Sequence, residues 1–162
     1  MRTILAILFM VLATADLASA QVDSSGARHL QLLAEVGPDS SSAVTLTGSC
    51  GTFQFRPTPV LTLEHVAEVV IEQHGMGEGY FVVLRLTKEG SERLQRETER
   101  LIGRRLGVVY SGQLKVAPFV QFPLSKRFPL NGSPMPLSEA EEVATDLNAR
   151  IGTLDPQSRD DA

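Results

Sequence analysis

The sequence predicts an α+β fold, a two-layer sandwich in which a mostly antiparallel sheet carries two helices packed on one face. Three observations support this prediction. Two β-rich stretches within residues 66–87 enclose a glycine-rich loop, as in a β-hairpin. Residues 88–102 and 139–151 each place apolar side chains on one helical face. Helices and sheets that are apolar on one side are expected to bury those sides against each other.

The first twenty residues have the pattern of a secretory signal peptide. Arg2 gives a positive start, residues 4–14 form an apolar run, and residues 18–20 form an A-x-A cleavage site. We expect cleavage between Ala20 and Gln21, because the apolar run is too short to span the ~30 Å hydrocarbon core as a retained anchor. With no other apolar stretch of spanning length, the mature chain is expected to be periplasmic or secreted.

The composition of the remaining chain suits one domain and excludes some classes of partner. The net charge is −4 at pH 7, which argues against nucleic acid, since nucleic-acid binding requires a basic patch. Cys50 is the only cysteine, so it cannot form an intramolecular disulfide. We expect a partly buried side chain there, with an intermolecular disulfide or a reactive thiol as the alternatives.

The N-terminal third is expected to consist of short strands and loops. Residues 21–42 form a flexible segment that could contain a first strand. The predicted domain covers residues 43–152 and begins with short strands at 44–46 and 52–55, separated by a glycine turn. A disordered tail is expected over 153–162.

The predicted hairpin begins with a segment in which helix and strand compete. The β-branched run Val69, Val70 and Ile71, the short length and a following glycine favour a strand over residues 66–73. Residues 80–86 form the second strand. Because a strand rather than a helix follows the glycines of the connecting loop, a flexible hairpin loop is favoured there over a dinucleotide-binding motif.

A helix, a strand and a turn follow the hairpin. Thr87 can cap the helix, and Gly103 can end it in a left-handed conformation. Residues 106–110 form a buried strand, and residues 114–120 continue as an extended segment after a turn. The apolar helical face comprises Leu94, Thr98, Leu101 and Ile102.

Prolines dominate the segment before the last helix. Five of the nine prolines lie between Pro118 and Pro136, and because proline cannot donate to a sheet ladder, edge or irregular strands are expected there. The last helix is predicted to begin with a capping box of Ser138 and Glu141 and to stop at Gly152.

Candidate binding residues lie in this proline-rich segment. Phe119, Phe122 and Phe128 could all belong to the core, and we expect at least two of them to do so. Any exposed ring could instead line an apolar groove, where an unpaired strand edge would capture an extended polypeptide by strand addition.

The helix at 88–102 interleaves acidic and basic residues. The simpler interpretation is a solvated face with weak ion pairs. The alternative is that Arg100, Arg104 and Arg105 form a small basic patch for the carboxylates of a partner.

Signals for catalysis or metal binding are missing from the sequence. His29, His65 and His74 lack metal-ligand spacing, and no nucleophile elbow is present. We therefore expect no catalytic residues, no metal site and no cofactor.

One family shares the order and spacing of these elements. The chain resembles the head subdomain of the first periplasmic domain of the SecD/SecDF protein-export subunits, and the match extends upstream through residues 60–62 and downstream through residues 130–144. The positions that carry the central resemblance are Leu86, Thr87, Gly90, Thr98, Gly103, Arg104, Leu106, Gly112, Ala117 and Pro118.

The resemblance implies a two-layer fold and a role in binding polypeptide. It does not imply the motor activity of those membrane proteins, since the mature chain has no predicted span. The chain departs from the family pattern at Val116, in a shortened loop at 125–128, and by one extra residue before the last helix.

The expected function is therefore an exported, non-enzymatic module that binds polypeptide or a protein partner, linked to export across the inner membrane. A small periplasmic ligand-binding protein or enzyme on the same fold is the alternative, which a cleft with perturbed acids around Glu64, His65 and Glu68 would favour. A structural subunit held by a membrane partner is a third.

Overall fold

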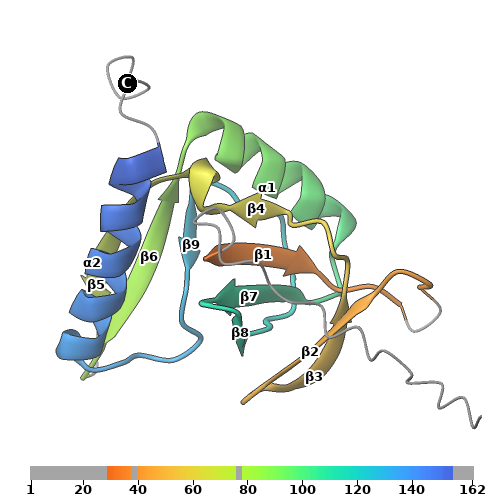
Figure 1. Cartoon of the computed structure of the whole chain (residues 1–162), viewed down its shortest axis with the longest axis horizontal. Helices are drawn as coiled ribbons and strands as arrows, with labels where there is room; N and C mark the ends of the chain where they lie inside the picture. Colours follow the sequence, from red (N-terminus) through yellow and green to blue (C-terminus); the bar gives the residue numbers. More distant parts are fainter. Residues whose placement is uncertain (1–28, 38–39, 76–77, 155–162) are drawn as a thin grey trace, which may run out of the picture.

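The strands form two sheets, with the helices covering the second sheet and the junction between the two (Figure 1). This computed structural model describes residues 29–37, 40–75 and 78–154. The expected signal peptide, its cleavage site at Ala20 and Gln21, and residues 155–162 of the expected tail lie outside the described residues.

The first sheet has six strands in the order β3-β2-β8-β7-β1-β4. All of its pairs are antiparallel except β2 with β8, which are parallel at Gly48 and Leu114. Its strands are β1 (Leu30–Ala34), β2 (Val44–Gly48), β3 (Gly51–Phe55), β4 (Leu61–Thr62), β7 (Leu106–Tyr110) and β8 (Gln113–Val116).

The second sheet has three antiparallel strands in the order β5-β6-β9. These are β5 (Val66–Gln73), β6 (Tyr80–Leu86) and β9 (Arg127–Pro129). The hairpin predicted over 66–87 is confirmed, and residues 66–73 form a strand rather than a helix. The α+β class is confirmed, with the strands divided between two sheets where one was expected.

The chain passes from one sheet to the other through a short 3₁₀ helix, η2 (Leu63–His65). β4, an edge strand of the first sheet, comes directly before this turn, and β5, the first strand of the second sheet, comes directly after it. The three residues of η2 thus connect an edge strand of the first sheet to an edge strand of the second.

The first strand belongs to the centre of the fold. β1 pairs with β7 on one side and β4 on the other, and Leu30 and Leu32 are fully buried. This strand precedes residue 43, where the sequence predicts the start of the domain, and it is the possible first strand expected in residues 21–42. Cys50 is exposed, so the expectation of a partly buried thiol is wrong.

Helix α1 (Lys88–Arg100) starts and packs largely as predicted. The Thr87 hydroxyl accepts the Gly90 N–H at 3.0 Å, and Gly103 has a φ of 82° just beyond the helix. The expected apolar face is wrong at Ile102, which is 54% exposed, because the helix ends at Arg100 and the chain has turned before reaching it.

Helix α2 (Leu137–Leu154) differs from the prediction at both ends. The Ala140 N–H donates to the Pro136 carbonyl, so the first turn closes before the predicted cap, and Ser138 lies inside the helix. Gly152 has no positive φ, and the helix continues through Leu154. Residues 153 and 154 are thus helical rather than part of the expected tail.

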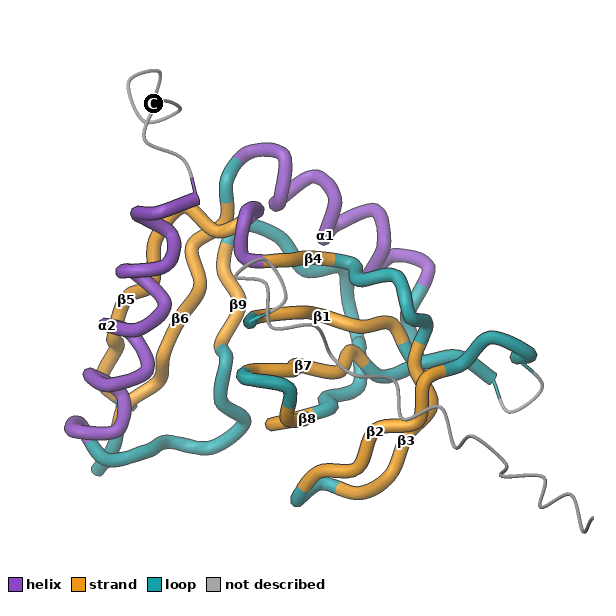
Figure 2. The backbone as a smooth tube through the Cα atoms, in the orientation of Figure 1, coloured by secondary structure: helices purple, strands orange, loops and turns teal. Residues whose placement is uncertain are grey.

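The larger of the two hydrophobic core clusters in the described residues joins both sheets and both helices. It combines side chains from β1 such as Leu32, from the hairpin such as Leu84, from α1 such as Leu94, and from α2 such as Leu147. Helix α2 lies along β5 and β6 (Figure 2). None of the helices in the described ranges is both long and apolar enough to cross a membrane.

Gly90 is the position in α1 where a side chain cannot be accommodated. A Cβ there would overlap the His65 carbonyl oxygen and lie 2.9 Å from the His65 Cβ. We expect Gly90→Ala to lower the free energy of unfolding by about 1–3 kcal/mol, because overpacking outweighs the better helix propensity. Chemical denaturation measures this change.

Gly152→Ala is the matched control, because it is a helical glycine with no atom within 4 Å of an added Cβ. It should raise the free energy of unfolding by about 0.5–1 kcal/mol. Equal effects of the two substitutions would contradict the close approach of α1 to His65.

Candidate functional site

An apolar groove of about 380 Å³ lies where the connection from β8 to β9 crosses between the two sheets. Its walls include Leu106 of the first sheet and Phe81 of the second. The complete lining is Phe81, Leu106, Val116, Pro118, Phe119, Val120, Gln121, Phe122, Leu124, Phe128, Pro129, Asn131 and Gly132.

Two of the three phenylalanines singled out in the sequence are exposed in this groove. Phe119 is 55% exposed and Phe122 is 64% exposed, whereas Phe128 is 3% exposed. The expectation that at least two of them belong to the core is wrong. Phe128 is buried where β9 pairs with β6 opposite Leu84, whereas Phe119 and Phe122 flank the buried Val120 in an irregular segment.

The backbone beside Phe119 is an open strand edge. The Pro118 carbonyl accepts the Leu106 N–H at 3.0 Å, and the Val120 N–H donates to the Arg104 carbonyl at 2.8 Å. Since alternate residues of an antiparallel strand point their polar groups to opposite sides, the N–H and carbonyl of Phe119 face away from this pairing. Pro118 and Pro123 limit the open edge to residues 119–122.

Arg105 holds the Phe119 ring in position. Its guanidinium lies 3.8 Å from the centroid of the Phe119 ring and 4.7 Å from that of Phe53. Its Nη1 also donates to the Ala117 carbonyl at 2.7 Å. The structure thus brings Arg105 and Phe119 together, and it uses the arginine for internal contacts.

Arg100 and Arg104 lie in different surroundings. Arg100 is 3.6 Å from Glu97, which also accepts a hydrogen bond of 2.7 Å from Arg56. That bond from Arg56 holds the pKa of the Glu97 carboxyl below its ordinary value, against the opposing effect of burial. Arg104 is exposed and pairs through its backbone with Val120, which places it beside the groove.

A cluster of titratable side chains was not foreseen from the sequence. His29 Nε2 lies 2.8 Å from Asp146 Oδ2 and 3.0 Å from the Ser111 hydroxyl, and the Tyr110 hydroxyl donates to the same Asp146 oxygen at 2.8 Å. The members converge from positions up to 117 residues apart, so no local spacing could have revealed them.

This cluster does not have the geometry of a catalytic triad. In a triad the serine and the carboxylate contact opposite nitrogens of the imidazole, whereas here both Ser111 and Asp146 contact Nε2 of His29. Its contacts instead tie β7 and the start of β1 to α2, which makes it a clamp between the first sheet and that helix.

The clamp shifts two pKa values. Burial alone would raise the pKa of Asp146, but hydrogen bonds from Tyr110, Arg150 and His29 outweigh it and lower that pKa. Burial, with the hydrogen bond to Asp146, raises the pKa of Tyr110 to about 12. The folded protein therefore favours an ionised Asp146 and a neutral Tyr110.

The acids considered for an enzymatic alternative do not converge. Glu68 pairs with Arg85 at 2.7 Å on the outer face of the second sheet, while the Glu64 carboxylate accepts from the Thr62 hydroxyl. His65 is buried, and its Nδ1 lies 3.0 Å from the Thr62 hydroxyl. Within the described ranges no group of three His, Cys, Asp or Glu side chains is placed to hold a metal ion.

The pKa of Asp146 predicts a contribution to acid stability. A carboxyl whose pKa is lower in the folded state stabilises the fold above its unfolded pKa of about 4 and loses this effect as the pH falls below it. Asp146→Asn should therefore weaken the decline of the thermal midpoint between about pH 5 and pH 2. The exposed Glu142→Gln is the control, and an unchanged acid decline in Asp146→Asn would refute the clamp.

Solved structures of SecDF share this fold. SecDF in a super-membrane-facing form is 19% identical with a TM-score of 0.56, and the match covers 75% of this chain and 18% of that chain. SecDF described as a membrane component that enhances protein export is 16% identical with a TM-score of 0.54, covering 75% of this chain and 60% of that one. The chain thus spans only part of each, and no curated protein matches it.

The family comparison covers most of the described residues. The family model of the SecDF P1 head subdomain matches residues 40–154, a range that includes the hairpin, both helices and the groove. The resemblance seen in the sequence is confirmed, and the chain belongs to the SecDF P1 head subdomain family.

Proposed function

We propose that this chain is an exported, non-enzymatic module that binds extended segments of polypeptide in the apolar groove, in the periplasm and in connection with protein export. The observation that carries the proposal is the pair of exposed rings, Phe119 and Phe122, beside an open strand edge. Membership of a protein-export family supports the link to export.

The groove provides two kinds of recognition that do not depend on a particular sequence. The outward N–H and carbonyl of Phe119 can pair with any extended backbone, and the rings can accept apolar side chains of varied shape. A polypeptide that has not yet folded offers both features. Because folded proteins bury most of their apolar side chains and pair their strands, they would be poor ligands.

Arg104 adds a charged rim to this proposed surface. It is exposed next to the segment that carries Phe119, so it can meet a carboxylate on the bound chain. Arg105 acts indirectly in this scheme, because its guanidinium stacks on Phe119. Of the three arginines, Arg100 is the least expected to contact the bound chain, because its guanidinium is close to the Glu97 carboxylate.

A small apolar ligand is the second candidate. A volume of about 380 Å³ lies within the range of ~300–1,000 Å³ that small-molecule sites occupy. The two candidates differ in whether the groove contacts other proteins in the cell.

Photocrosslinking in intact cells tests the polypeptide proposal. A photoreactive amino acid at Phe122 should capture many exported precursors or subunits of the export machinery, identified by mass spectrometry. Ile102 is the matched control, because it is similarly exposed, at 54% against 64%, but lies outside the groove lining. A single unrelated partner would instead indicate a dedicated complex, and no protein crosslinks would favour a small ligand.

Substitution of the two rings separates binding from folding. Phe119→Ser with Phe122→Ser should weaken the binding of an unfolded model polypeptide at least about tenfold, since exposed aromatic anchors dominate such interfaces. The thermal midpoint should change little, because both rings are exposed. Fluorescence anisotropy with labelled reduced and carboxymethylated α-lactalbumin measures the binding. Full binding by this folded variant, or equal loss in Ile102→Ser, would refute the groove.

A further inference from the structure

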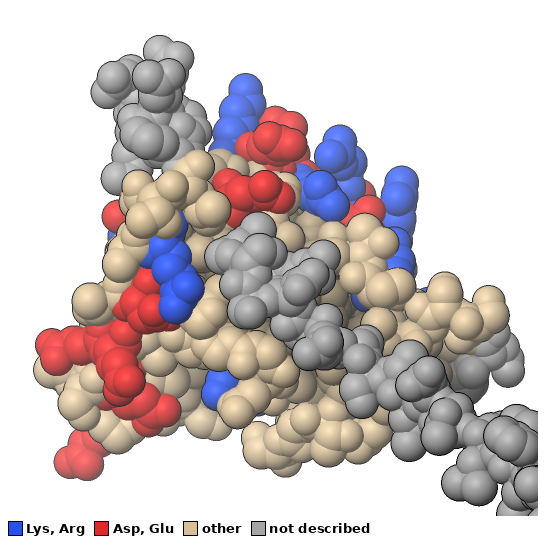
Figure 3. Space-filling model, in the orientation of Figure 1, with Lys and Arg blue, Asp and Glu red and all other residues tan. Residues whose placement is uncertain are grey.

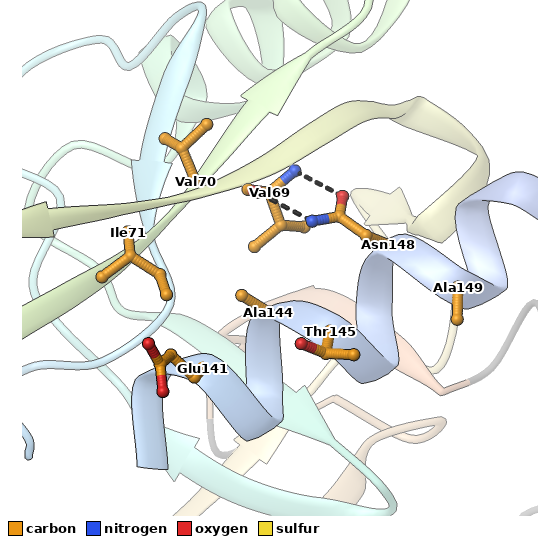
Figure 4. Close-up of a pocket in the computed structure, with 8 residues that line it drawn as sticks. All are labelled: Val69, Val70, Ile71, Glu141, Ala144, Thr145, Asn148 and Ala149. Carbon is orange, nitrogen blue, oxygen red and sulfur yellow. Dashed lines mark hydrogen bonds between the residues drawn. The ribbon is translucent and has the colours of Figure 1, made fainter. Parts of the chain in front are cut away.

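The outer edge of β5, on the side away from β6, is closed at one residue by a side chain from α2 (Figure 4). Asn148 Oδ1 accepts the Val69 N–H at 3.0 Å, and Asn148 Nδ2 donates to the Val69 carbonyl at 2.9 Å. A neighbouring strand would make the same two bonds to Val69. The amide therefore takes the place of one residue of a missing strand.

The same edge is open over the next residues of β5. The backbone N–H and carbonyl of Val69 point away from β6. Alternation along a strand places the N–H and carbonyl groups of Ile71 and Gln73 on the same side. The opposite residues of β6 agree with this. Val82 bonds Asn131 and Leu130 on its far side, so it does not engage Ile71, which is its partner in register.

The backbone groups of Tyr80, at the end of the hairpin, likewise point away from β5. Its N–H donates to the Met135 carbonyl at 2.9 Å, and its own carbonyl accepts the Met135 N–H at 3.0 Å. It therefore has no bond left for Gln73, its partner in register. Ile71 and Gln73 thus present two outward N–H groups and two outward carbonyls.

A hollow of about 630 Å³ lies between this edge and one side of α2. The small side chains Ala144, Thr145 and Ala149 leave this space open, with Glu141 at the N-terminal end of the helical wall (Figure 4). Strand, hollow and helix together have the arrangement in which an extended peptide adds to a sheet edge beside a helix.

The charge beside the hollow selects the occupant. Acidic side chains gather at the lower left of the molecule, where α2 begins (Figure 3). No described residue forms an ion pair with Glu139, Glu141 or Glu142. Edge-to-edge pairing with a second copy would bring two such acidic helix ends toward each other, whereas a segment carrying Lys or Arg would complement them.

We propose that the β5 edge and the adjoining side of α2 form a docking site for an extended, basic segment of a partner protein. The segment adds to β5 as a strand at Ile71 and Gln73, its small apolar side chains enter the hollow, and its cation meets Glu141. Asn148 limits the ladder at Val69. This site is separate from the groove at Phe119, and it does not depend on the function proposed there.

Peptide titration of the full chain tests this proposal. The probe is the peptide acetyl-Thr-Lys-Val-Ala-Val-Lys-Thr-amide, followed by amide shifts in NMR spectra. The shifts should be largest at Ile71, Gln73 and Ala144. The alternate peptide bonds of the probe can be N-methylated in two ways, at the odd or at the even positions. One of these two sets should abolish binding, because it removes the N–H groups that donate to β5 and leaves the charge of the peptide unchanged.

Variants of the protein assign the two kinds of contact. Gln73→Pro removes one outward N–H at an exposed end of an edge strand, where proline is tolerated, and should weaken binding about fivefold. Glu141→Gln should weaken it about twofold to fivefold, whereas Glu92→Gln, an exposed control on α1, should have no effect. Asn148→Ala should strengthen binding, because the ladder can then extend to Val69.

Three results would overturn the proposal. The first is binding that tolerates both sets of N-methylation, which would be electrostatic attraction without strand addition. The second is no binding at millimolar probe by a protein whose spectrum shows the intact fold. The third is a dimer of Asn148→Ala that forms in preference to the peptide complex, which would make a second copy the occupant.

Discussion

The contact between η2 and the start of α1 determines where the rest of the structure lies. The His65 carbonyl accepts both the N–H and the hydroxyl of Thr87, and Gly90 allows the helix to approach it closely. At this point the chain leaves the six-stranded sheet, returns through the hairpin and enters α1. The His65 carbonyl therefore ties the start of α1 to the turn that leads into the second sheet.

The groove depends on that placement through hydrogen bonds from α1. The buried Thr98 hydroxyl donates to the Leu94 carbonyl and accepts the Leu124 N–H at 2.9 Å. The Ser91 hydroxyl accepts the N–H of Lys126 at 3.0 Å, and the Leu86 N–H donates to the Lys126 carbonyl. The proline-rich segment has little regular structure of its own, so these bonds from α1 and β6 anchor its backbone at Leu124 and Lys126, shortly after Phe122.

Side-chain amides complete the edges of the second sheet. Asn148 bonds the backbone of Val69 in β5, and Asn131 bonds Val82 and Tyr80 in β6. A three-stranded sheet has two edges, and unprotected edges favour association with other chains. Asn148 covers only Val69, so the β5 edge stays open at Ile71. The segment at Phe119, which forms an isolated bridge to Arg105, has an open edge of its own. The two proposed binding surfaces lie at these openings.

The sequence by itself determined the elements whose signals are local. The β-branched run at 69–71, the cap at Thr87 and the glycine at 103 depend on neighbours within a few residues, and the structure has the expected hairpin and helix start. The ordered family motifs likewise identified the family. A local signal was also overridden, because the Pro136 carbonyl closed α2 before the predicted cap at Ser138.

Only the tertiary structure decided what is buried and what meets across the chain. The central place of β1, the exposure of Phe119 and Phe122, and the stacking of Arg105 on a ring all depend on pairing between distant segments. The same holds for the clamp between His29 and Asp146 and for the bonds of Asn148 to β5. Burial and hydrogen bonding of this kind are properties of the packed chain, and no periodicity within one segment encodes which distant segment will cover it.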